Sequence, residues 1–146
     1  MKFVAQRVLC ATLTVDDQLV SEIGRGLVVY LGVKTGDHIT AVKKIAEKIA
    51  KLRVFSDEAG KMNLSVKDIG GEVLLVSQFT LYGDARKGNR PSFTDAARGD
   101  EANPLYEAAV KELREVWDIP VKTGIFGADM HILQKNEGPV TIIYEV

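Results

Sequence analysis

The chain has 146 residues, of which 46% are hydrophobic and 27% are charged, the composition of an ordinary soluble globular protein. Its 19 basic and 20 acidic residues give a net charge of -1. This balance argues against bulk, non-specific adhesion to nucleic acid, which needs a net basic surface, but it leaves room for a local basic patch. We expect one domain, residues 1–146, long enough to bury a core.

Cysteine, histidine and the apolar runs exclude several further classes. The single cysteine, Cys10, allows no internal disulfide and suits a reducing compartment. His38 and His131 stand far apart, with no ligand spacing around either, so we expect no metal and no cofactor. The N-terminus becomes charged too early for a signal peptide, and no apolar run approaches membrane length. We expect a cytoplasmic protein.

The first part of the chain has the pattern of three strands. Residues 3–15 alternate, but both faces are largely apolar, and Arg7 is one of the few exceptions. Asp16-Asp17 predicts a turn into residues 18–23, the second arm of a hairpin. Residues 27–33 then form an apolar run typical of a buried strand.

Two helices are predicted by apolar residues at helical spacing. The first follows Asp37, a plausible N-cap, and extends to Leu52. Its polar side carries Lys43, Lys44, Glu47, Lys48 and Lys51. Such a side is usually solvated, although it could contact phosphates. Asn103 and Pro104 are suited to begin the second helix, which ends near residues 117–120.

Further strands are predicted at residues 53–55, 121–126, 129–135 and 140–146. Strands therefore alternate with two helices along the whole chain. This order predicts an α/β fold: a single layered domain with mixed β-sheets covered by two main helices.

A polar cluster ends the most apolar strand of the chain. Residues 73–76 form a continuous apolar run, and Ser77, Gln78 and Thr80 follow within four residues. Buried polar groups need partners. Two interpretations stay open here: a strand emerging into a loop, or the floor of a ligand site.

Two other segments are ambiguous when taken alone. Residues 82–91 form a Gly-rich loop with Arg86, Lys87 and Arg90; it is either an exposed connection or a grip for the phosphates of a polyanion. Gly138-Pro139 precedes the last predicted strand, and the ordinary interpretation is a hairpin turn with proline at the first strand position.

Taken together, two four-residue segments are specific. Ser77-Gln78-Phe79-Thr80 and Gly138-Pro139-Val140-Thr141 resemble the two signature motifs of the D-aminoacyl-tRNA deacylase family. The resemblance covers the whole chain. It includes Gln6-Arg7-Val8, Gly60-Lys61-Met62-Asn63-Leu64-Ser65, Arg86-Lys87-Gly88, Arg90-Pro91-Ser92-Phe93 and Phe126-Gly127-Ala128-Asp129-Met130. Departures at Gly83, Asn89 and Glu145-Val146 touch no motif.

The resemblance implies a homodimer that hydrolyses D-aminoacyl-tRNA in translation quality control. Each active site would combine the catalytic segment Ser77–Thr80 of one subunit with the substrate-binding segment Gly138–Thr141 of the other. The resemblance also implies a cis Gly138-Pro139 bond, held in part by Arg7. Phe79 and Met130 would contribute to a pocket for the terminal adenosine of tRNA.

The residue types suit hydrolysis of an ester. Backbone N–H groups of Phe79 and Thr80 could stabilise the developing oxyanion. Attack by the Thr80 or Ser77 hydroxyl would need an adjacent base, and the sequence offers no convincing one. We therefore expect direct attack by water, assisted by the ribose 2′-OH of the RNA.

The proline motif also predicts how D- and L-amino acid substrates are distinguished. In the implied cis geometry, two carbonyls at Gly138-Pro139 would hold the substrate's ammonium group, so an L side chain would collide with them while a D side chain would point to solvent. Glycine has no Cβ and cannot be rejected in this way. We therefore expect activity on glycyl-tRNA, including glycine mischarged onto tRNA for alanine.

Two other classes of function remain open on the sequence alone. One is a non-catalytic RNA-binding module that uses Arg86, Lys87 and Arg90; it lacks interleaved aromatic residues and a net basic charge. The other is a Thr80-dependent esterase acting on small D-amino acid esters without RNA.

Overall fold

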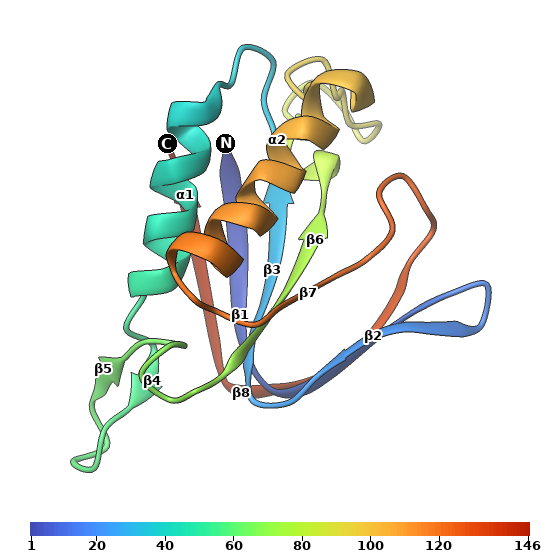
Figure 1. Ribbon diagram of the computed structural model, residues 1–146. Helices are drawn as coiled ribbons and strands as arrows, with labels where there is room; N and C mark the ends of the chain where they lie inside the picture. Colours follow the sequence, from blue (N-terminus) through green and yellow to red (C-terminus); the bar gives the residue numbers. More distant parts are fainter.

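The computed structural model describes all 146 residues and contains one large sheet, one small sheet and two main helices (Figure 1). The strands are β1 (Lys2–Val15), β2 (Gln18–Ile23), β3 (Gly26–Gly32), β4 (Phe55–Ser56), β5 (Met62–Leu64), β6 (Glu72–Ser77), β7 (Val121–Thr123) and β8 (His131–Glu145). The helices are α1 (Ile39–Lys51) and α2 (Gly99–Lys111), with a 3₁₀ turn at Phe79–Tyr82 and a π turn at Glu112–Val116. The predicted fold class, a mixed sheet covered by two helices, is confirmed.

The large sheet has the order β2-β1-β3-β6-β7, and β8 pairs with the free edge of β1. β1 is antiparallel to β2, β3 and β8, whereas β3, β6 and β7 run parallel. Parallel neighbours need crossover connections. α1 lies between β3 and β6 in the chain and α2 between β6 and β7, and both helices cover the same face of the sheet (Figure 1).

Both faces of the central strands are buried. On the helix side, Phe3, Val29 and Leu75 pack in the larger core with residues of α1 and α2. On the other side, Val28 and Leu74 pack against Leu13, Ile23 and Ile132, because the second half of β1, β2 and the first half of β8 bend across the sheet. This two-sided burial explains the continuous apolar runs in β3 and β6.

Neither predicted helix cap is the observed one. α1 begins after His38, and Asp37 accepts hydrogen bonds from the backbone N–H of Lys34 and from the amino group of Met1. α2 begins at Gly99 and contains Pro104 in its interior. Acidic residues in its first turn, Asp100 and Glu101, suit the positive end of the helix dipole better than the predicted cap at Asn103.

The predicted strands 129–135 and 140–146 are one continuous strand, β8, and Gly138-Pro139 lies inside it. Both halves pair with β1. The register of the pairing shifts between the two halves. Asn136 pairs with Val8 and Thr141 pairs with Gln6, so β8 has more residues than β1 over this stretch. The extra residues project from the strand as an irregular turn, which is where proline is tolerated in a sheet.

Two other predicted strands differ in length or position. The segment predicted at 53–55 forms β4 one to two residues later, at Phe55–Ser56, where it pairs with β5. The segment predicted at 121–126 ends at Thr123, and residues 124–130 leave the sheet to form a wall of the cavity described next.

Candidate functional site

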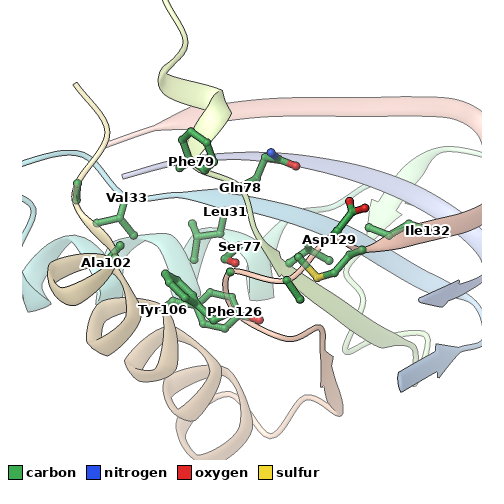
Figure 2. Close-up of a pocket in the computed structure, with 16 residues that line it drawn as sticks. Leu31, Val33, Ser77, Gln78, Phe79, Ala102, Tyr106, Phe126, Asp129 and Ile132 are labelled. Atoms are coloured by element: carbon green, nitrogen blue, oxygen red, sulfur yellow. The ribbon is translucent and has the colours of Figure 1, made fainter. Parts of the chain in front are cut away.

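The main cavity opens at the carboxyl ends of β3 and β6 and has a volume of about 490 Å³. It lies between the end of β6, the first half of α2 and the segment that follows β7 (Figure 2). Its lining is mostly apolar: Leu31, Val33, Val76, Ser77, Gln78, Phe79, Ala97, Gly99, Ala102, Tyr106, Phe126, Gly127, Ala128, Asp129, Met130 and Ile132. An apolar cavity with a few polar groups is the usual form of a small-ligand site.

The polar end of β6 forms the rim of this cavity. β7 pairs with β6 only as far as Leu75, so Ser77 and Gln78 emerge from the ladder on that side. The backbone N–H of Gln78 donates to Leu31 O at 2.8 Å, and the Gln78 side-chain amide donates to the Thr80 hydroxyl. Phe79 starts the 3₁₀ turn and is 56% exposed. This segment therefore lines a cavity and does not simply continue into an exposed loop.

Tyr106 supports the same strand end from α2. Its hydroxyl donates to Leu75 O at 2.7 Å, in the place where β7 no longer covers β6. Burial raises the pKa of Tyr106 well above its ordinary value, so the hydroxyl stays a neutral donor at physiological pH. Its ring lies 6.0 Å from that of Phe126 across the cavity floor.

The opposite wall is the segment that follows β7. Met130 lines the cavity, and its sulfur packs so closely over Gly124 that a Cβ there would meet it at 2.4 Å. Asp129 also lines the cavity, with its side chain 96% exposed. Phe79 is contacted edge-on by Phe93, with ring centroids 5.2 Å apart.

The second predicted segment, Gly138–Thr141, does not line this cavity within the same chain. Gly138 and Pro139 are exposed, joined by a cis peptide bond, and absent from the cavity lining. The buried guanidinium of Arg7 donates to Glu137 O at 3.1 Å and to Val54 O. Thr141 accepts a hydrogen bond from the Gln6 side chain, and Val140 is half-buried against the larger core.

The predicted site residues thus form two groups within one chain. Ser77, Gln78, Phe79 and Met130 line the cavity, and Thr80 borders it through its bond with Gln78. Arg7 holds the turn at Glu137–Gly138 and belongs to the second group. Neither group contains a base poised against a hydroxyl, and neither histidine lines the cavity. No group of three or more possible metal ligands occurs in the structure.

Sequence reasoning missed the contribution of α2. Gly99 and Ala102 are small and three residues apart, which leaves room for the cavity, and Tyr106 follows one turn later. A tyrosine on the buried stripe of a helix, whose hydroxyl needs a partner, was the available signal.

The basic loop is partly neutralised. Arg86 makes a two-point contact with Asp84, at 2.9 and 2.8 Å, and this hydrogen bonding lowers the pKa of Asp84 to about 2. Lys87 and Arg90 are exposed and make no ion pair.

No helix combines the length and apolar character needed to cross a membrane.

Comparison with known proteins gives a consistent result. A family model described as D-Tyr-tRNA(Tyr) deacylase matches residues 4–145. Proteins named D-aminoacyl-tRNA deacylase are 55% identical over 145 residues in Heliobacterium modesticaldum, covering 99% of this chain and 96% of that protein, and 49% identical over 146 residues in Lactobacillus helveticus, covering 100% of both. A solved structure titled c-Myc DNA Unwinding Element Binding Protein has a TM-score of 0.94 at 42% identity, covering 100% of this chain and 99% of that one. A structure described as a probable eukaryotic D-amino acid tRNA deacylase shares the fold, with a TM-score of 0.88 at 18% identity over 99% of this chain and 98% of its own.

Proposed function

The chain belongs to the D-Tyr-tRNA(Tyr) deacylase family, and from this premise we propose that it is a D-aminoacyl-tRNA deacylase, a hydrolase that cleaves the ester between a D-amino acid and the terminal ribose of tRNA. The observation that carries the proposal is the cavity at Ser77–Phe79, because this segment resembles a signature motif of the family. The products are free tRNA and the D-amino acid. Such a reaction belongs to translation quality control, and we place it in the cytoplasm.

The cavity suits a terminal adenosine. Phe79, Phe126 and Met130 offer apolar surfaces on which a purine base can stack. The half-buried Ser77 and Gln78 at the rim supply the few polar groups that fix the orientation of a ligand.

The chemistry follows from the start of the 3₁₀ turn. The first N–H groups of a helical turn have no acceptor within it, so those of Phe79 and Thr80 are free to bind the developing oxyanion. Ser77 and Thr80 have no base beside them. We therefore assign the attack to water, assisted by the neighbouring ribose 2′-OH, and give Thr80 a scaffolding role.

We further propose a homodimer in which the Gly138-Pro139 turn completes the cavity of the partner subunit. Within one chain the turn projects from β8 and is exposed. β8 is also an edge strand, and Leu133 and Ile143 on it are 77% and 68% exposed. A long edge strand with large apolar residues is a common surface for self-association.

The projecting turn also gives a basis for chiral selection. If carbonyl groups of the turn bind the substrate's ammonium group, the α-carbon is fixed at two points, and the backbone of the turn blocks the position of an L side chain. Arg7 keeps that backbone in place. Glycine escapes this collision, so glycyl-tRNA, including glycine on tRNA for alanine, is a substrate.

A deacylation assay tests the proposal directly. D-tyrosyl-tRNA, L-tyrosyl-tRNA and glycyl-tRNA are incubated with the purified protein, and the remaining ester is measured over time. We expect rapid loss of the D-tyrosyl and glycyl esters and no loss of the L-tyrosyl ester beyond the enzyme-free rate.

The three substrates separate the parts of the proposal. Equal hydrolysis of D- and L-esters would remove the chiral role. Stable glycyl-tRNA at enzyme levels that clear D-tyrosyl-tRNA would contradict the collision model. Hydrolysis of small D-amino acid esters but not of charged tRNA would favour an RNA-independent esterase.

A further inference from the structure

A hollow with an excess of positive charge lies on the outer side of α1, away from the cavity. It has a volume of about 360 Å³ and is lined by Lys44, Glu47, Lys48, Lys51, Leu52, Arg53 and Tyr144. We call this set the α1 basic hollow. It holds four cations and one carboxylate, in a chain whose net charge is -1.

Most of these cations are available to a ligand. Lys44, Lys48 and Arg53 form no ion pair, whereas Lys51 pairs with Glu47 at 2.7 Å. Lys48 Nζ lies 4.9 Å from the centre of the Tyr144 ring, which fixes its position without neutralising it. The single carboxylate therefore leaves an uncompensated positive surface.

This surface adjoins the Gly138-Pro139 turn. Arg53 precedes Val54, whose carbonyl accepts a hydrogen bond from Arg7, and the same guanidinium donates to the carbonyl of Glu137. One buried side chain thus connects the end of the α1 basic hollow with the turn. α1 and α2 lie beside each other on one face of the sheet (Figure 1), and the lining of the α1 basic hollow shares no residue with the lining of the cavity.

We propose that the α1 basic hollow binds the phosphodiester backbone of the substrate tRNA. The inference rests on the proposed function. When the turn of one subunit completes the cavity of its partner, the hollow beside that turn faces the RNA that leaves the cavity. Lysine and arginine around a hollow, with few carboxylates, are what sequence-independent contact with phosphates requires.

The test compares two substrates and two variants. Lys44→Ala combined with Arg53→Ala removes two unpaired, exposed cations and no hydrogen bond. Lys61→Ala combined with Lys122→Ala is the matched control, since both side chains are exposed, form no ion pair and lie outside the hollow, and the charge change is the same. The substrates are D-tyrosyl-tRNA and the D-tyrosyl ester of adenosine, which has no phosphodiester backbone.

On D-tyrosyl-tRNA we expect the first variant to raise KM about tenfold at moderate salt, with little change in kcat. The slope of log KM against log salt should fall by about one to two, because each lost phosphate contact contributes about 0.7–0.9. Hydrolysis of the adenosine ester should stay at the parental rate in both variants. The control should retain the parental KM for tRNA.

Several outcomes would overturn the inference: an unchanged KM for tRNA, an equal loss on the adenosine ester, or an equal loss in the control. Direct binding of uncharged tRNA separates this inference from the function on which it rests. If the parent hydrolyses neither ester yet binds tRNA with a salt slope that depends on Lys44 and Arg53, the proposed activity fails and the RNA surface stands. If it hydrolyses D-tyrosyl-tRNA with no such dependence, the surface fails and the activity stands.

Discussion

At the scale of single residues, the Tyr106 hydroxyl takes the place of a strand. The pairing of β7 with β6 ends at Leu75, and the Tyr106 hydroxyl donates a hydrogen bond to the carbonyl oxygen of Leu75. A buried carbonyl is thereby satisfied without a further strand, which would fill the cavity. The edge of the sheet stays accessible to a ligand because the Tyr106 hydroxyl satisfies the carbonyl group that a further strand would otherwise pair with.

Tyr106→Phe tests this role. The change keeps the ring against Phe126 but leaves Leu75 O without its donor, so we expect the free energy of unfolding to fall by about 1–3 kcal/mol. Urea denaturation followed by circular dichroism measures the difference. Tyr144→Phe is the control, since no hydrogen bond of the Tyr144 hydroxyl occurs in the structure. Equal stability of the Tyr106 variant and the parent would show that the bond contributes nothing.

Thr80 is a second residue whose role can be separated from its position. Its hydroxyl accepts a bond from Gln78 and has no base beside it, so Thr80→Ala should keep kcat for D-tyrosyl-tRNA within about tenfold of the parent, the scale of a lost supporting bond. The parent acting on tRNA with a 2′-deoxy terminal adenosine should lose much more. Quenched-flow deacylation measures both. An inactive Thr80→Ala beside an unaffected deoxy substrate would reverse the assignment.

At the scale of elements, local signals predicted some features and tertiary contacts decided others. The apolar runs of β3 and β6 and the turn at Asp16-Asp17, where both residues have positive φ, were readable because burial and turn chemistry act within a few residues. The start of α2 was not, because Asn103 and Pro104 mimic a cap inside a helix that begins at Gly99.

The features of the candidate site also fall into those with a local sequence signal and those decided by tertiary contacts. Ser77 and Gln78, which line the cavity, carry a local signal because polar groups at the end of a buried strand require an explanation, whereas Phe79 was indicated only by the family resemblance. The continuity of β8 was missed because Gly138-Pro139 resembles a turn, and pairing with β1 on both sides of it is a non-local contact. Ala102 carries no local signal at all, since its small size matters only when α2 lies over the cavity.

The loop after the 3₁₀ turn yields a pH prediction. Hydrogen bonds from Arg86 lower the pKa of Asp84 from its ordinary 3.8 to about 2. A lowered folded-state pKa means that the contact is fully present above pH 3.8 and is lost as the pH falls through about 2. We expect the carboxyl carbon of Asp84 to titrate near pH 2 in an NMR experiment. In Arg86→Ala the midpoint should rise toward 3.8; a midpoint that does not move would show that Arg86 is not the cause.

At the scale of the whole molecule, the two groups of site residues within one chain lead to a test of assembly. Ala102→Trp fills the cavity, and Gly138→Ala places a Cβ at φ +122°, 3.0 Å from Val140. Each variant alone should be inactive. In a cross-subunit site, a mixed dimer would carry one doubly altered site and one intact site, so refolding the two variants together should restore about a quarter of the parental activity.

Size-exclusion chromatography with light scattering accompanies this mixing experiment. We expect twice the mass of the chain for the parent and for both variants. Activity that is not restored in a mixture shown to contain mixed dimers would contradict the shared site. A fully active monomer would contradict the dimer itself.

The pairing of β1 with β8 also affects how the chain folds. The two strands join nearly opposite ends of the chain, Lys2 with Glu145 and Thr14 with His131, so their ladder closes a loop that contains almost everything else. Non-local pairing of this kind slows folding, to milliseconds or longer in many β-rich domains. Until β8 arrives, β1 presents an unpaired edge to any other chain. Refolding should therefore be more vulnerable to aggregation at high protein concentration than the compact native sheet suggests.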